Sequence, residues 1–268
     1  MSTTKYSLAE DLALAQQIAD AADLITQSRY QSQDLVITTK LDNTPVTDAD
    51  KATETAIREI LARERPNDGV LGEEFGESDN LGSRYWVIDP IDGTQNFMRS
   101  VPSWSTLIAL VENGEVIVGV VSAPALTRRW YASKGNGAFV QFNGGAARRI
   151  SVSKVAQIKD ASITYSDFKH WEDRRPAFIS LIDQCWRSRA FGDYWSHMLV
   201  AEGAADIAVE PVLAVWDMAA LDIVVREAGG SFTSITGEPG PHHGSGLSTN
   251  GLLLDQVVRH LNGSIDRN

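Results

Sequence analysis

Residues 85–94 decide the fold of this chain: Tyr85-Trp86-Val87-Ile88-Asp89-Pro90-Ile91-Asp92-Gly93-Thr94. The apolar first half predicts a buried β-strand, and a strand that ends in carboxylates delivers them to one edge of a sheet. Pro90 fixes one backbone angle and Gly93 allows a tight turn, so both aspartates are held on a stiff bend. Oxygen ligands at this spacing suit Mg²⁺, although Asp and Gly are also common in turns without a function.

The composition limits what the chain can do. With 268 residues, 43% of them hydrophobic and 22% charged, it is typical of a soluble globular protein that buries a large core. The net charge of −11 argues against nucleic acid or an anionic membrane as the main partner. The chain has no apolar run of membrane-spanning length, no signal-peptide pattern at its start, and a single cysteine, Cys185, so we expect a cytoplasmic protein.

The order of the predicted elements divides the chain into two halves, about 1–152 and 153–268, of one compact domain. The first half predicts two helices followed by an antiparallel sheet, and the second alternates strands with helices. The predicted helices cover 8–30, 48–62, 171–186, 194–202 and 216–228, and the predicted strands cover 36–38, 106–111, 116–121, 129–132, 138–142, 148–152, 163–165, 188–191 and 207–209. We expect both halves to contribute to a shared cleft.

Further acidic groups stand at predicted turns: Asp48-Ala49-Asp50, Glu73-Glu74 and Asp217. Each has an ordinary structural explanation, because the aspartates can cap helices and the glutamates can simply face solvent. Their joint occurrence with the aspartate pair at the end of the 85–94 segment is what favours a metal site.

These acidic stretches resemble the motifs of the inositol monophosphatase family. The matching stretches are Thr44-Pro45-Val46-Thr47-Asp48-Ala49-Asp50, Gly72-Glu73-Glu74, residues 89–94, and Trp216-Asp217 with Glu227-Ala228-Gly229-Gly230 downstream. The resemblance covers most of the chain and implies an α/β (α+β) fold, a layered α-β-α-β-α sandwich. It also implies a phosphoric monoester hydrolase that acts on a small phosphorylated substrate, uses two or three Mg²⁺ ions per active site, and forms a homodimer.

The resemblance implies a role for each matching residue. The implied metal ligands are Glu73, Asp89, the carbonyl of Ile91, Asp92 and Asp217, and the implied catalytic residues are Thr94, Asp50 and Glu73. Thr94, supported by Asp50, would position and help deprotonate the attacking water. Paired cations would supply the charge neutralisation that phosphate monoester hydrolysis, a very slow uncatalysed reaction, requires. The amides of Gly93 and Thr94, at the start of a short helix, are placed to receive phosphate oxygens.

The pattern differs from the Asp-x-Asp-Gly-Thr motif of phosphatases that form a covalent aspartyl-phosphate. The first aspartate of that motif is replaced here by Pro90, and Asp89 lies one residue too early. We therefore expect direct attack by metal-activated water.

Substrate choice in the family lies in the second half of the chain. Glu210 stands where family members hold the alcohol part of the substrate, and residues 191–196 cover the same pocket. The expected substrate-binding residues are Asp92, Gly93, Thr94, Trp104, Gly192, Asp193, Tyr194, Glu210 and Asp217. Carboxylates beside aromatic rings favour a cationic, planar leaving group over a neutral polyol. The ordinary alternative is that Tyr194 and Trp195 pack the helix that they begin.

These segments, with 122–126 and Arg128-Arg129-Trp130, most resemble the actinobacterial histidinol-phosphate phosphatases of the same superfamily. The resemblance implies hydrolysis of L-histidinol phosphate late in histidine biosynthesis. Gln95 is a departure, because many relatives have Lys there. Two alternatives stay open: an inositol-1-phosphate phosphatase of broad specificity, and a non-catalytic regulatory binding protein. The histidines show no metal-ligand spacing, and His197 is expected to pack in the core or to face solvent, with the cleft as the alternative.

Overall fold

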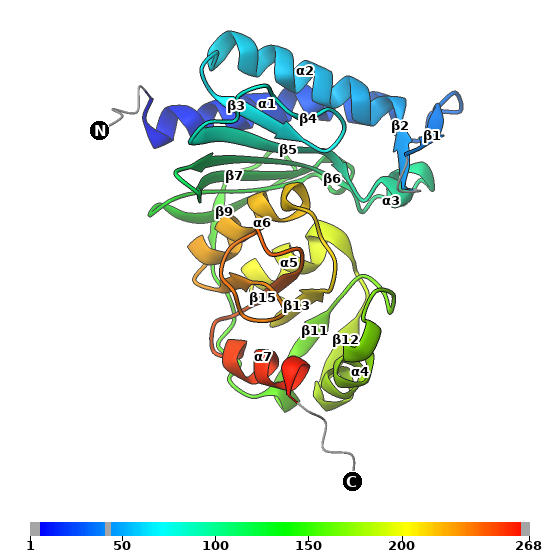
Figure 1. Ribbon diagram of the computed structural model, residues 1–268, viewed down its shortest axis with the longest axis vertical. Helices are drawn as coiled ribbons and strands as arrows, with labels where there is room; N and C mark the ends of the chain where they lie inside the picture. Colours follow the sequence, from blue (N-terminus) through cyan, green and yellow to red (C-terminus); the bar gives the residue numbers. More distant parts are fainter. Residues whose placement is uncertain (1–5, 41–43, 264–268) are drawn as a thin grey trace.

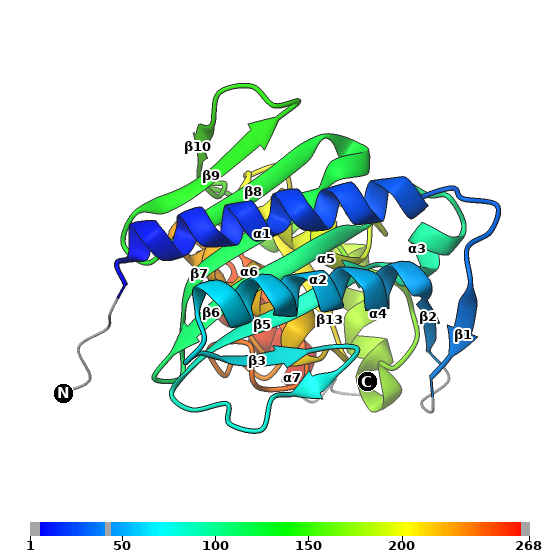
Figure 2. The same cartoon turned by 90° about the horizontal axis from the view of Figure 1, so that it is seen from above.

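The computed structural model describes residues 6–40 and 44–263, in which layers of helices and strands alternate (Figure 1). Its helices are α1 (Leu8–Arg29), α2 (Asp48–Glu64), α3 (Thr94–Met98), α4 (Arg175–Gln184), α5 (Asp193–Ala201), α6 (Val215–Glu227) and α7 (Leu254–Asn262). Helices α1 and α2 lie side by side over one sheet, as Figure 2 shows from above, and α5 and α6 fill the space between this sheet and a second one. Helices α4 and α7 cover the outer face of the second sheet. The expected α-β-α-β-α sandwich is confirmed.

The first sheet has 8 strands in the order β10-β9-β8-β7-β6-β5-β3-β4. They are β3 (Gly69–Gly72), β4 (Gly76–Glu77), β5 (Arg84–Asp92), β6 (Ser105–Glu112), β7 (Glu115–Ala123), β8 (Arg128–Ser133), β9 (Gly137–Phe142) and β10 (Arg148–Ile150). Neighbours are antiparallel except for β3 and β5, which run parallel. The turn at Asn113-Gly114 joins β6 to β7, which match the strands predicted over 106–111 and 116–121. Across the described residues, no helix has the length and apolar character needed to cross a bilayer.

Strand β5 is buried because helices pack on both of its faces. Trp86 and Ile88 pack with α1 and α2, whereas Val87 packs with the middle helices α5 and α6. This alternation follows from the period of two along a strand. Because β3 and β5 are parallel, their carboxyl ends reach the same edge of the sheet, and Glu73 N donates to Ile88 O at 3.1 Å there. The edge therefore carries acidic residues from two neighbouring strands.

The second sheet is mixed and has 5 strands in the order β12-β11-β13-β15-β14. They are β11 (Ser162–Thr164), β12 (Arg187–Arg189), β13 (Ile207–Glu210), β14 (Ser231–Thr233) and β15 (Gly246–Thr249), while β1 (Ile37–Thr39) and β2 (Pro45–Thr47) pair separately. Strand β11 is parallel to β12 and β13, and β15 is antiparallel to β13 and β14. The second sheet thus places the end of β13, with Glu210, beside β15.

The structure differs from the predicted elements mainly in the second half. The helix expected over 171–186 begins only at Arg175, after a 3₁₀ turn at Glu172–Arg174, and Pro176 stands in its first turn. Proline favours that position because its missing N–H would have no partner there anyway. Strands β14 and β15 and helix α7 were not predicted, since the two strands span only 3 and 4 residues between glycine-rich turns.

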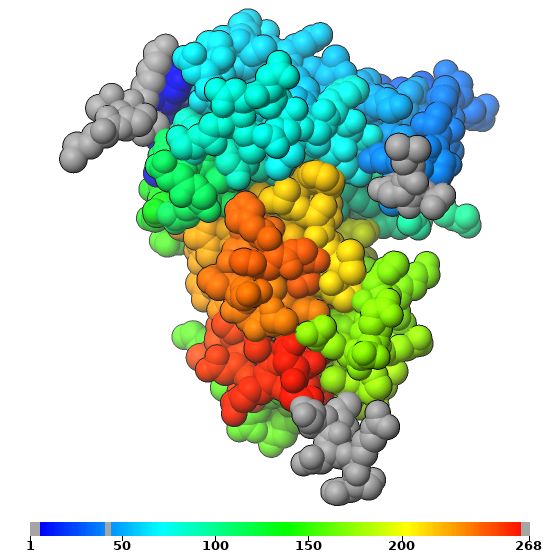
Figure 3. Space-filling view, viewed as in Figure 1, coloured from blue at the N-terminus to red at the C-terminus, as the bar shows by residue number. Residues whose placement is uncertain are grey.

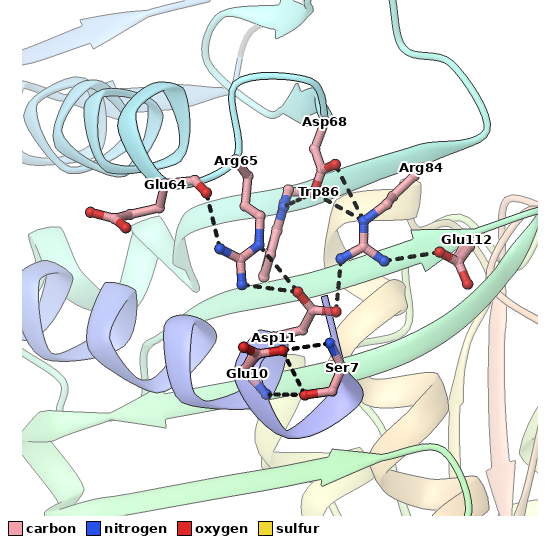
Figure 4. Close-up of polar contacts among 9 residues, drawn as sticks. All are labelled: Ser7, Glu10, Asp11, Glu64, Arg65, Asp68, Arg84, Trp86 and Glu112. Atoms are coloured by element: carbon pink, nitrogen blue, oxygen red, sulfur yellow. Dashed lines mark hydrogen bonds and ion pairs between the residues drawn. The ribbon is translucent and has the colours of Figure 1, made fainter. Parts of the chain in front are cut away.

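A buried network of charged side chains ties α1 and α2 to the first sheet (Figure 4). Asp11 of α1 is 1% exposed and accepts hydrogen bonds from Arg65, the residue that follows α2. Asp11 Oδ2 lies 2.7 Å from Arg84 Nη2 at the start of β5, and Arg84 also contacts Asp68 and Glu112. Buried charges are tolerated when they are paired and hydrogen-bonded. The network therefore fixes both outer helices at the end of the sheet where β5 begins.

Candidate active site

Three aspartates meet where β5 ends against the middle helices. Asp89 and Asp92 flank an irregularity in the β5–β6 pairing, and Asp217 lies in the first turn of α6. One carboxylate oxygen of each lies within 4.8 Å of the other two. A regular strand would point residues three apart to opposite faces, so the irregularity is what brings Asp89 and Asp92 together. We call these three residues the aspartate cluster.

Asp217 both caps α6 and belongs to the aspartate cluster. Its Oδ2 accepts a hydrogen bond from Ala214 N at 2.7 Å, so it satisfies a backbone donor at the start of α6. The same carboxylate belongs to the aspartate cluster. The hydrogen bond fixes its orientation, and the helix N-terminus stabilises its negative charge.

Glu73 approaches the cluster from the neighbouring strand. Burial raises the pKa of Asp89 and Asp217, and the charge of Glu73 adds to this effect at both residues. Lys40 Nζ lies 2.7 Å from Glu73 Oε1 and 2.7 Å from Glu74 Oε1. The structure thus brings three of the four predicted carboxylate ligands together and places the fourth beside them, paired with a lysine.

A buried glutamate of α2 shapes the Glu73-Glu74 turn. Glu54 is fully buried, accepts a hydrogen bond from Glu74 N at 2.7 Å and pairs with Arg58 at 2.8 Å. A Cβ atom at Gly72 would lie 2.0 Å from Glu54 Oε1. A side chain at this position would displace the Glu54 carboxylate from its contacts with Glu74 and Arg58, which favours glycine where α2 approaches the end of β3.

Thr94 begins α3 beside the aspartate cluster. Its Oγ1 lies 3.4 Å from Asp50 Oδ1 and 3.1 Å from the carbonyl oxygen of Ile91, whose side chain packs in the core. Asp50 is fully buried in the first turn of α2 and accepts a hydrogen bond from Thr47 N at 2.8 Å. Burial raises the pKa of Asp50 to about 6. A carboxylate with this proton affinity, behind a hydroxyl group, can take part in proton transfer near neutral pH.

The aspartate cluster fits a divalent cation. Burial, and then repulsion from neighbouring acids, raises the pKa of Asp89 and Asp92 well above the ordinary value, and burial raises the pKa of Asp217 to about 7. Asp89 Oδ1 is buried and has no hydrogen-bond partner within the described ranges. Converging carboxylate oxygens of this kind are ligands for hard divalent cations. A bound cation would relieve the repulsion and give the orphaned oxygen a partner.

The aspartate cluster lies at a cavity of about 540 Å³ lined by both halves of the chain. Figure 3 shows a hollow in the surface between the blue and cyan upper part and the green segment below it. The lining includes Glu73, Asp92, Gly93, Thr94, Gln95 and Asp217, together with Gly192, Asp193, Tyr194 and Glu210. All of the expected substrate-binding residues except Trp104 border this cavity.

Asp193 borders the cavity in a strained backbone conformation, which two hydrogen bonds maintain. Its φ of +49° is unusual for a residue other than glycine. Its backbone N–H donates to Ser166 Oγ at 3.1 Å, and its Oδ2 accepts a hydrogen bond from Asn96 Nδ2 at 2.9 Å. Burial, and then the charge of Glu210, raises the pKa of Asp193 to about 7. These contacts fix the Asp193 carboxylate at the cavity, close enough for its charge to raise the pKa of Asp92.

The prediction that Trp104 forms a wall of the pocket is wrong. Trp104 is fully buried and does not border the cavity. Its ring centroid lies 5.0 Å from that of Phe97 and 5.4 Å from that of Tyr30, so it belongs to an aromatic cluster beneath α3. A ring of this size gains more free energy in the core than at a polar cavity.

Tyr194 contributes its backbone rather than its ring. The residue borders the cavity, and its N–H donates to Asp92 Oδ2 at 2.9 Å. Its side chain is fully buried, with the ring centroid 6.0 Å from that of Trp130, as the packing alternative proposed. Trp195 does not border the cavity either. Its ring packs against the ring of Phe191, and Phe191 borders the cavity.

Lys40 and Asn96 also contact acidic residues of the site, and neither was predicted. Lys40 is 33 positions from Glu73, so no local pattern connects them. Asn96 follows the Asp-Gly-Thr motif by two residues, and that proximity is the signal that would have found it. His197, which the sequence left between core and cleft, is fully buried and also borders the cavity.

Comparison with known proteins identifies the family. The family model described as the inositol monophosphatase family matches residues 7–265. The chain belongs to this family and is a phosphoric monoester hydrolase.

Individual relatives agree with this assignment. Histidinol-phosphatase from Mycobacterium tuberculosis is 56% identical over 255 residues, which cover 94% of this chain and 98% of that protein. Histidinol-phosphatase from Streptomyces coelicolor is 51% identical over 259 residues, covering 94% and 97%. The solved structure of extragenic suppressor protein suhB from Bartonella henselae has a TM-score of 0.86 at 28% identity, covering 96% of this chain and all of that one.

Proposed function

We propose that this chain is a Mg²⁺-dependent phosphatase that converts L-histidinol phosphate and water to L-histidinol and phosphate in histidine biosynthesis. One observation carries the proposal: Asp193 and Glu210 border the same cavity as the aspartate cluster. Among the described residues, neither has a lysine or arginine as ion-pair partner. Buried carboxylates need a partner, and the ammonium and imidazole groups of histidinol supply one, whereas a neutral polyol does not. The two histidinol-phosphatase relatives support the same substrate.

The phosphate side of the proposed site lies at the end of β5. The proposed metal ligands are Glu73, Asp89, the Ile91 carbonyl, Asp92 and Asp217. Bound Mg²⁺, with two or three ions in each site, would supply positive charge at the phosphate and stabilise the leaving oxygen. Thr94 orients the attacking water and Asp50, through the threonine hydroxyl, accepts proton density from it. The amides of Gly93 and Thr94 donate hydrogen bonds to phosphate oxygens.

The alcohol side of the proposed site lies at α5 and the end of β13. Glu210 binds the ammonium group of the leaving alcohol, and Asp193 accepts a hydrogen bond from its imidazole. Since both carboxylates are largely buried, each interaction is stronger than it would be in water. Recognition of the alcohol therefore depends on residues that are not ligands of the metal.

The deciding experiment compares kcat/KM for L-histidinol phosphate and inositol 1-phosphate, with Mg²⁺ and after chelation. With Mg²⁺, we expect a clearly higher kcat/KM for L-histidinol phosphate. After chelation, we expect this activity to be lost. A preference for inositol 1-phosphate would instead establish the broad-specificity phosphatase, and undetectable turnover of both esters would favour the regulatory binding protein.

Three other expected properties need separate measurements. Calorimetric titration with Mg²⁺ counts the ions, light scattering tests the homodimer, and cell fractionation tests the cytoplasmic location.

A further inference from the structure

The imidazole of His197 lies between the second sheet and the cavity. The residue belongs to α5 and is fully buried, yet it borders the cavity beside Glu210. His197 Nδ1 lies 2.7 Å from Ser248 Oγ, and His197 Nε2 lies 3.8 Å from Glu210 Oε1. The ring therefore connects a hydroxyl group of β15 to the carboxylate at the end of β13.

The ring has little freedom to move. Strands β13 and β15 are paired, with Ala208 opposite Ser248 and Glu210 opposite Gly246. A Cβ atom at Gly246 would lie 3.4 Å from His197 Cε1, and the ring centroid of Phe232 is 5.6 Å from that of His197. Strands β13 and β15 thus carry the two polar neighbours of the imidazole, and Gly246 of β15 and Phe232 of β14 confine it.

Two facing atoms are left without partners by this arrangement. His197 Nε2 and Glu210 Oε1 are both buried, and neither has a hydrogen-bond partner in the part of the chain that the structure describes. A histidine that only packed in the core would need no acidic neighbour, and burying unsatisfied polar atoms costs free energy. Since the atoms face each other at the cavity, a small shift of Glu210 would join them.

We propose that His197 is a positioning residue that fixes the Glu210 carboxylate for binding a cationic leaving alcohol. The Ser248 hydroxyl donates to Nδ1, which leaves the proton on Nε2, directed at Glu210 Oε1. The hydrogen bond forms as Glu210 moves onto the ammonium group of the substrate, and its other oxygen accepts from that group. This inference rests on the proposed function, because it requires a substrate whose alcohol part is cationic.

The test is a double-mutant cycle on kcat/KM with two substrates, L-histidinol phosphate and phenyl phosphate. For L-histidinol phosphate, His197→Phe should raise KM about tenfold with kcat little changed, the effect of losing one hydrogen bond to a charged group. In the Glu210→Gln background the same substitution should change kcat/KM less than about twofold, because the two residues act as a unit. Turnover of phenyl phosphate, whose leaving group is uncharged, should stay unchanged in His197→Phe.

Three further variants separate positioning from packing. His197→Gln, which retains a side-chain N–H, should recover part of the loss, and Ser248→Ala should raise KM about threefold through the freed imidazole. Both also serve if His197→Phe does not fold. Ser196→Ala is the matched control, because Ser196 is fully buried on the same helix and pairs with Thr164 at 2.7 Å. It should leave the ratio of the two substrates unchanged.

The outcomes distinguish this inference from the function on which it rests. If the wild-type enzyme prefers inositol 1-phosphate, the proposed function fails and the role of His197 fails with it. If the wild-type enzyme prefers L-histidinol phosphate and Glu210→Gln abolishes that preference, the function stands. In that case, additive losses in the cycle, or equal losses on phenyl phosphate, would overturn the positioning role alone.

Discussion

Asp92 connects the two sides of the site at the scale of a single residue. Its carboxylate belongs to the aspartate cluster and also accepts the hydrogen bond from Tyr194 N, at the start of α5. The side chain therefore joins the end of β5 to the helix that carries Asp193. A substitution here changes both the charge of the cluster and the contact between the halves.

We expect Asp92→Asn to lower kcat/KM more than about 100-fold, because a proposed metal ligand loses its charge. In EDTA the variant should melt at a higher temperature than the wild-type protein, because one of several mutually repelling buried acids is gone. Assays with Mg²⁺ and thermal melts in EDTA check the two effects. The control Asp79→Asn, at an exposed position, should change neither, and a lower melting temperature for Asp92→Asn would contradict the repulsion argument.

Glu210→Gln tests recognition of the alcohol. We expect KM for L-histidinol phosphate to rise between about 10-fold and 100-fold, because a charge-assisted hydrogen bond is lost. Turnover of an aryl phosphate should be nearly unchanged. Steady-state kinetics on both esters measure this, with the exposed Glu238→Gln as control. Equal losses on the two substrates would place Glu210 in the catalytic machinery instead.

The sequence predicted the residues at and beside the aspartate cluster better than those of the pocket. Glu73 follows Gly72, and Asp92 and Thr94 flank Gly93, so each lies in a short contiguous motif by which the family resemblance could locate it. Trp104 was misplaced because its burial depends on Tyr30, a residue from a distant segment. No local pattern could show that the ring would pack beneath α3 rather than face the cavity.

Strands and helices were predictable where their periodicity is long enough to read. Strands β5 to β9 each span at least 6 residues, and the predicted positions for them are confirmed. In the second sheet, β11, β12 and β13 lie where strands were predicted, although each spans only 3 or 4 residues. Strands β14 and β15 are equally short and were not predicted, because so few residues hardly distinguish alternation from chance.

The Asp11 network makes a prediction about how the outer helices are held. Asp11→Ala leaves Arg65 and Arg84 without their shared acceptor, and we expect the free energy of unfolding to fall by about 3 kcal/mol. Urea unfolding followed by circular dichroism measures the change. The control Glu115→Ala breaks an ion pair with Lys134 on the surface, where the expected loss is below about 1 kcal/mol. Similar decreases in the free energy of unfolding in both variants would show that the buried network stabilises the fold no more than a surface ion pair.

For the whole molecule, the stability of the metal-free protein should depend on pH through the raised pKa values of its site. Burial raises the pKa of Asp50 to about 6 and those of Asp193 and Asp217 to about 7, from an ordinary value of 3.8. At pH values between the ordinary pKa and the raised pKa of these carboxyl groups, the folded state binds more protons than the unfolded chain. The free energy of unfolding therefore falls as pH rises from about 4 through 7.

We therefore expect the melting temperature in EDTA to be lower at pH 8 than at pH 6, and the increase caused by Mg²⁺ to be larger at pH 8. A cation takes the place of the protons, and its affinity grows as they dissociate. Scanning calorimetry at both pH values, with and without Mg²⁺, provides the measurement. An increase that is equal at the two pH values would contradict the link between protonation and cation binding.

The middle layer has a consequence for how such a protein can change over evolutionary time. In the proposed function, residues before 95 and Asp217 form the phosphate side of the cavity, and α5 and the end of β13, after residue 190, form the alcohol side. Mutations in the later segment can therefore exchange one leaving alcohol for another while the earlier segment preserves the hydrolytic reaction. A single scaffold can in this way give rise to many phosphatases, each inheriting the same chemistry and acquiring its own substrate.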